Sequence, residues 1–60
     1  MWRATFNLFG DEVWVGDFLN YEIAVEACRQ SANFEYYENG VSGLIYTIWY
    51  DGHLYQEISF

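Results

Sequence analysis

The chain has 60 residues, nine of them acidic and two basic, so its formal net charge at pH 7 is −7. Such a chain repels phosphate groups, which excludes direct nucleic-acid binding and favours a protein partner with a basic surface. A single cysteine excludes an intrachain disulfide, and no apolar run is long enough to cross a membrane, so we expect a cytoplasmic protein without membrane contact.

The N-terminal segment has the alternation of a β-hairpin. Its first strand has apolar residues at every second position, namely Trp2, Ala4, Phe6 and Leu8. This period of two predicts a strand with one buried face. A tight turn at Gly10-Asp11 would pair Leu8 with Val13 across the hairpin. Trp14 would then lie on the outer face.

The period changes after Asp17 to that of a helix. Small and apolar residues fall on one stripe, which comprises Ile23, Ala24, Ala27, Cys28, Ser31 and Phe34. Asn20 or Asp17 can cap the helix start, and Glu22 in the first turn suits the helix dipole. Glu22 and Glu26 fall on the opposite, polar side, where Glu26 can pair with Arg29 three residues later.

The C-terminal part predicts further strands. Residues 34–38 could form a short strand before Asn39-Gly40, and residues 44–50 form a stronger one before Asp51-Gly52. Asn-Gly and Asp-Gly are strong hairpin signals. The whole chain, 1–60, is therefore expected to be one compact α+β domain of two layers. One helix packs on an antiparallel sheet of four to five strands, in the order β-β-α-(β)-β-β.

The last hairpin has large apolar residues on both faces, whereas one helix covers only one face of a sheet. We expect the core to contain Phe6, Leu8, Val13, Val15, Ile23, Ala27, Ile45, Trp49, Leu54 and Ile58. The other face would then expose Tyr46, Ile48, Tyr50 and Tyr55, joined by Trp14. A patch of this kind is typical of a protein interface. The alternative is a plain surface on which tyrosine is tolerated for its β-propensity.

Candidate chemistry is weak throughout the chain. A metal site at Asp51, His53 and Glu57 would lack a second histidine or a thiolate. Cys28 lies on the apolar stripe, where a cysteine usually acts as a small hydrophobic residue and not as a nucleophile. The acidic pairs look like solvated surface, and no nucleotide-binding or nucleophile motif is present. We therefore predict no enzyme activity, no cofactor and no metal.

Two functions fit these observations. The first is a small acidic inhibitor or modulator, of the type that viral or mobile-element genomes encode. It would block a larger, possibly nucleic-acid-binding, enzyme by contact or by charge mimicry. Its partner-binding residues would be the exposed patch and the carboxylates of Glu22 and Glu26. The second is a self-associating structural or scaffolding module without an inhibitory role. A homodimer is expected in either case, and the acidic surface could also serve only solubility.

Overall fold

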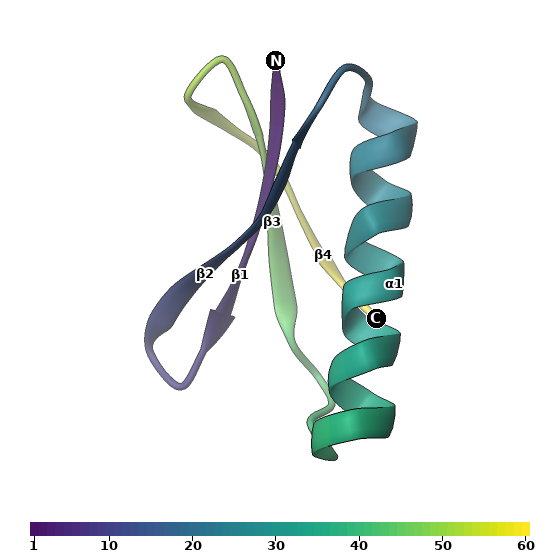
Figure 1. Ribbon diagram of the computed structural model, residues 1–60. Coiled ribbons are helices and arrows are strands. Elements are labelled where there is room, and N and C mark those ends of the chain that lie inside the picture. The colour runs from purple at the N-terminus through teal and green to yellow at the C-terminus, as the bar shows by residue number, and fades with distance from the viewer.

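The protein forms a four-stranded antiparallel sheet with one helix packed on one face, in the computed structural model that describes all residues, 1–60 (Figure 1). The elements follow the chain as β1 (Trp2–Leu8), β2 (Asp11–Phe18), α1 (Tyr21–Asn39), β3 (Ile45–Tyr50) and β4 (His53–Ser59). The strands lie in the order β2-β1-β3-β4. This confirms the predicted α+β class and the two layers.

The helix is longer than predicted and takes the place of the optional strand at 34–38. Asn20 caps its start, where its side-chain oxygen accepts a hydrogen bond of 2.9 Å from the Ile23 N–H. Gly40 ends it in the left-handed conformation with φ 67°, and its N–H donates to the Tyr36 carbonyl. Asn39-Gly40 therefore ends a helix instead of turning a hairpin. Glycine serves both purposes because each requires a positive φ.

The first hairpin turns one residue earlier than predicted. Its turn residues are Phe9 and Gly10, with φ of 52° and 89°. The Asn7 side chain accepts a hydrogen bond of 3.0 Å from the Gly10 N–H, which stabilises this turn. Phe6 consequently pairs with Val13, and the expected pairing of Leu8 with Val13 is wrong.

Each edge strand contains a β-bulge. In β2 the register shifts between Ala4 and Thr5 of the neighbouring strand, which leaves Val15 as the extra residue. In β4 it shifts between Ile48 and Trp49 of β3, which leaves Tyr55 as the extra residue. A one-residue shift moves every later side chain to the other face of the sheet. The second bulge is the reason that Ile58 lies opposite Tyr46 instead of opposite Ile45.

The core uses the opposite face of β3 from the one predicted. Tyr46 and Ile48 are fully buried under α1, so the expectation that they are exposed is wrong. They pair with Phe6 and Ala4 of β1, and this pairing turns them towards the helix. The remaining core side chains are those of Ala24 and Cys28, whose small size lets the helix lie close to the sheet. Ile45, Trp49 and Leu54, expected in the core, lie on the opposite face.

Some of the other residues predicted in the core are buried or half-buried, and some are exposed. Phe6 is buried, and half-buried side chains from the predicted set pack around it, namely Leu8, Val13, Val15 and Ile58. On the helix, Ala24 and Cys28 face the sheet, whereas Ile23 is 50% exposed. Ala27 is only half-buried. The face of α1 that packs on the sheet is therefore rotated by about one residue from the predicted stripe.

Candidate protein-binding site

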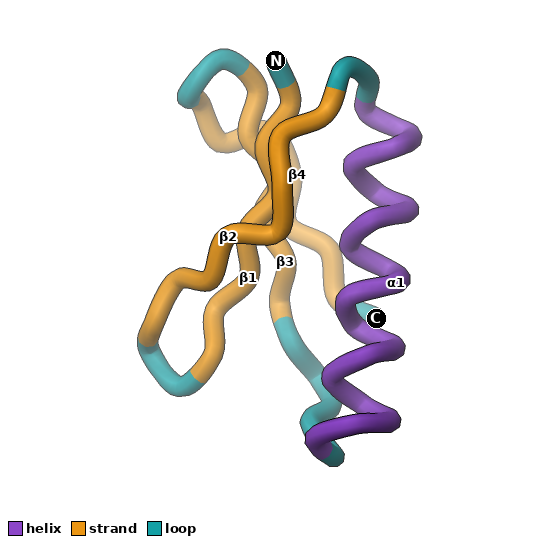
Figure 2. The backbone as a smooth tube through the Cα atoms, viewed as in Figure 1, coloured by secondary structure: helices purple, strands orange, loops and turns teal.

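The face of the sheet opposite α1 has no covering layer, and we call it the open face. The helix runs along one side of the sheet only (Figure 2). Cross-strand pairing places two rows of side chains on the open face. One row is Asp17, Arg3, Trp49 and Leu54, and the next is Trp14, Thr5, Thr47 and Glu57. Ile45, the first residue of β3, lies on the same face. The open face thus combines charged side chains with apolar ones, of which Trp49 lies on a central strand and Trp14 and Leu54 lie on the two edge strands.

Large apolar side chains on the open face are exposed to solvent. Trp14 is 62% exposed, Ile45 52% and Leu54 57%. Trp49 is half-buried because its ring lies across β1, where the indole N–H donates to the Thr5 hydroxyl over 2.9 Å. That contact leaves Thr5 only 4% exposed although no helix covers it. Trp49 is therefore held in a fixed position as the centre of the open face.

The Trp49–Thr5 contact makes a first prediction. In Thr5→Val the indole N–H loses its acceptor while the side-chain volume is retained. We expect a loss of about 1 kcal/mol in the free energy of unfolding, measured by urea titration. Thr47→Val, next to Thr5 on β3, is the matched control, because no hydrogen bond joins its hydroxyl to another side chain. Equal stability of the two variants would contradict a structural role for the bond.

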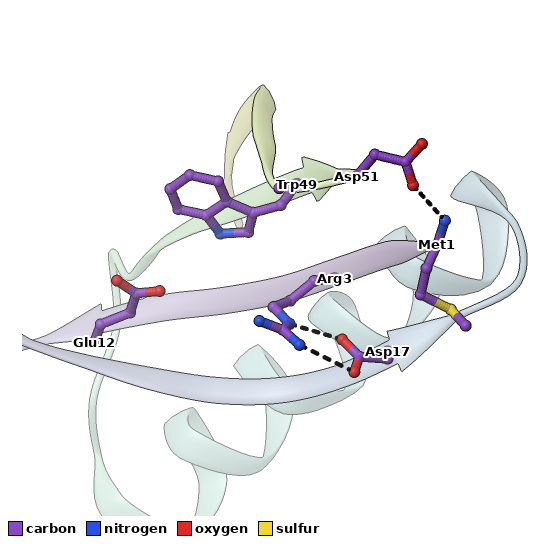
Figure 3. A pocket seen from close by; sticks show the side chains of 7 residues that line it. Met1, Arg3, Glu12, Asp17, Trp49 and Asp51 are labelled. Carbon is purple, nitrogen blue, oxygen red and sulfur yellow. Dashed lines mark hydrogen bonds and ion pairs between the residues drawn. The ribbon is translucent and has the colours of Figure 1, made fainter.

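Charges on the open face are mostly negative, and its only basic side chain is neutralised. The Arg3 guanidinium donates two hydrogen bonds to Asp17, over 2.8 and 3.3 Å, and hydrogen bonding to Arg3 lowers the pKa of the Asp17 carboxyl. The N-terminal ammonium donates to Asp51 over 2.9 Å. These two pairs border a shallow hollow of about 330 Å3, with Trp49 on one side (Figure 3). Glu12, which also lines the hollow, and Glu57 have no ion-pair partner.

The residues predicted to bind a partner fall into separate groups. Trp14 lies on the open face. Tyr46 and Ile48 are in the core, where a partner cannot reach them without unfolding the domain. Glu22 and Glu26 are exposed on α1, on the other side of the molecule from Trp14. The predicted patch is therefore not one surface.

Tyr50 and Tyr55, the other predicted patch residues, lie on the helix side of the sheet. They surround Trp2, whose ring centroid is 4.5 Å from that of Tyr50 and 4.9 Å from that of Tyr55. Tyr21 at the start of α1 completes the cluster at 5.4 Å from Trp2, and its hydroxyl donates to Gln56. These rings pack against one another on the helix side of the sheet, beside the start of α1.

Sequence reasoning missed three open-face residues, Ile45, Trp49 and Leu54, because it assigned them to the core. The pattern of β3 is apolar on both faces, so its alternation contains no sign of which side the helix covers. One signal was available in β1. Arg3, Thr5 and Asn7 form its polar face, and any neighbour paired with Arg3 must share the face that the helix does not cover.

Cys28 is the only nucleophilic thiol, and it is inaccessible. It lies on the side of α1 that packs on the sheet, where it is fully buried, and burial raises its pKa to about 11. We expect no reaction with the thiol reagent DTNB at pH 8 in the native protein and one equivalent after unfolding in urea. Rapid labelling of the native protein would contradict the burial. The structure contains no group of three or more potential metal-ligating side chains of the His, Cys, Asp or Glu type.

Two further observations concern the whole chain. The one helix, α1, is not apolar enough along its length to cross a membrane. Comparison with models of protein families, with curated proteins and with solved structures found no match. A functional conclusion therefore depends on the open face itself.

Proposed function

We propose that the protein is a small acidic inhibitor or modulator that acts in the cytoplasm without catalysis, by binding a larger protein through the open face. The observation that carries this proposal is the uncovered apolar side chains of Trp14, Trp49 and Leu54, beside carboxylates that have no free cation to neutralise them. Exposed apolar surface next to one sign of charge is typical of an interaction site.

The charge defines the partner. Arg3 is occupied by Asp17 and the N-terminal ammonium by Asp51, whereas Glu12 and Glu57 are unpaired. A partner that brings lysine or arginine side chains would form new ion pairs here without displacing existing ones. A negative field also speeds the encounter with a basic surface. The proposed partner is therefore a protein with a basic surface.

Such a surface occurs in enzymes that bind nucleic acid, because they neutralise phosphates with lysine and arginine. A protein of 60 residues with a net charge of −7 could occupy such a site and exclude the substrate. Inhibition of this kind requires only affinity for the site. We therefore include charge mimicry in the proposal, as its mechanism.

The alternative function is a self-associating structural module. One observation favours it: six of the seven residues of β4 are exposed, including Leu54 and Tyr55. In that case the open face would contact another copy of this chain, or would serve only the association of copies, and would not bind a different protein. The two functions differ in what they require of Trp14, since only the first requires it to contact a different protein.

The test uses a photo-cross-linking amino acid at position 14 in cells that produce the protein. Its matched control carries the same amino acid in place of Tyr37, which is 79% exposed on α1. Proteins joined only from position 14 are purified and titrated by calorimetry with the wild type, Trp14→Ala and Tyr37→Ala. We expect Trp14→Ala to weaken binding by about 30-fold, as for an aromatic hot spot, and Tyr37→Ala to leave it within about twofold.

Inhibition is then measured as the partner's activity against increasing concentrations of each protein. The wild type should inhibit, and Trp14→Ala should require a proportionally higher concentration. No partner specific to position 14, or equal binding by both alanine variants, would refute the open face as the binding site. Binding without any effect on activity would refute inhibition and retain the binding function.

A further inference from the structure

The two edges of the sheet differ in how they are protected against pairing with another strand. β2 is covered on one side by α1 and carries Asp11, Glu12 and Asp17 along its length. Charges and covering elements are common means of preventing edge-to-edge association. β4 has one carboxylate, that of Glu57, and no lysine or proline. Its protection is limited to the bulge at Tyr55.

β4 also lies beyond the main contact of the helix. α1 packs on β2 and β1 and to a lesser extent on β3, whereas β4 is linked to it through Tyr21. As a result, Tyr55 is 58% exposed on the helix side and Leu54 57% exposed on the open face. Apolar side chains are therefore exposed on both faces in the first half of β4, and Ile58 is half-buried in the second half.

We propose that β4 pairs with β4 of a second copy of this chain, antiparallel and about a two-fold axis perpendicular to the sheet. A strand is its own complement in this arrangement, because each copy contributes the same N–H and C=O groups in opposite directions. The product is one continuous sheet of eight strands, with β2 at both outer edges. The bulge at Tyr55 confines the pairing to the part of the strand that follows it.

The dimer has two consequences. Both open faces lie on the same side of the continuous sheet, which doubles the acidic surface without covering it. Each copy also brings a charge of −7, so the copies repel each other and added salt should strengthen the pairing. The four residues of β4 that follow Tyr55 span about 13 Å and give a small interface. We therefore expect a dissociation constant of about 10–100 µM.

The inference concerns an edge of the sheet and does not depend on the binding role of the open face. Its first test is sedimentation equilibrium of the wild type from about 10 to about 500 µM at low and at high salt. The expected result is a monomer–dimer equilibrium in which the dimer fraction rises with salt. Binding of a basic partner to the open face should instead weaken with salt, so failure of either proposal is visible separately.

The second test locates the contact. Glu57→Cys and Glu12→Cys are compared on a Cys28→Ala background, with a short bismaleimide as cross-linker. Both variants remove one exposed carboxylate, and they place the thiol on opposite edge strands, β4 and β2. We expect covalent dimer from Glu57→Cys and little from Glu12→Cys. A wild type that stays monomeric at every concentration, or equal cross-linking of the two variants, would overturn the proposal.

Discussion

Tyr46→Ala is expected to abolish cooperative folding. Tyr46 is fully buried among Phe6, Cys28 and Ile48, and its hydroxyl donates to Ser31 over 2.9 Å. Removing a buried aromatic ring costs about 3–5 kcal/mol. A domain of this size has a free energy of unfolding of only about 3–9 kcal/mol. The variant should therefore have little or no thermal transition by circular dichroism at 25 °C and above.

Two further variants separate the contributions of the ring and the hydroxyl. Tyr46→Phe keeps the ring and leaves Ser31 without its donor, so we expect a loss of about 1 kcal/mol. Tyr37→Ala removes a ring that is 79% exposed on α1 and should change stability by less than about 0.5 kcal/mol. If Tyr46→Ala and Tyr37→Ala unfold at the same temperature, the helix does not cover the face of β3 that contains Tyr46.

Local signals in the sequence predicted most of the fold. The Asn20 cap and the Asp51-Gly52 turn are confirmed, and the turn pairs Tyr50 with His53 and Trp49 with Leu54. Each depends on residues close together in the chain. The helix end was missed because Asn39-Gly40 fits both a hairpin turn and a helix terminus.

The faces of the sheet could not be assigned so easily. Side chains alternate between the two faces of a strand, so one inserted residue reverses the face of every later side chain. The bulges at Val15 and Tyr55 each insert one residue, and alternation predicts no bulge from apolar patterns of this kind. The partner of β3 is also a long-range choice. Pairing Ala4 with Ile48 sets which side of β3 is buried, and these residues are far apart in the chain.

The candidate site was predicted on the wrong residues because the two faces of β3 were interchanged. Alternation along residues 44–50 predicts Trp49 in the core and Tyr46 at the surface, although tryptophan and tyrosine are both enriched at interfaces. Tyr46 can nevertheless be buried, since Ser31 on α1 accepts its hydrogen bond. Trp49 can remain at the surface, since Thr5 accepts the hydrogen bond of its indole. In both cases a hydrogen-bond partner distant in sequence decided the side chain's position.

Neutralising the unpaired carboxylates of the open face is expected to slow association with the basic partner. Glu12→Gln with Glu57→Gln removes two negative charges from the open face while keeping side-chain size. At low salt we expect the association rate constant, measured by stopped flow, to fall about tenfold, with a smaller change in the dissociation rate. At about 0.5 M salt the difference should largely disappear, because the Debye length is then only a few Å.

Glu22→Gln with Glu26→Gln is the matched control, since it changes the net charge equally on the opposite side of the molecule. Rates should be compared at protein concentrations well below those at which copies of the chain pair, because loss of Glu57 also reduces repulsion at the β4 edge. A tenfold fall in the association rate constant for the open-face pair alone would mean that the position of the charge, and not the total charge, guides the partner. The reverse result would assign the partner to the helix side. Equal losses would mean that the acidic surface acts only through net charge, because a distant pair then contributes as much as one in contact.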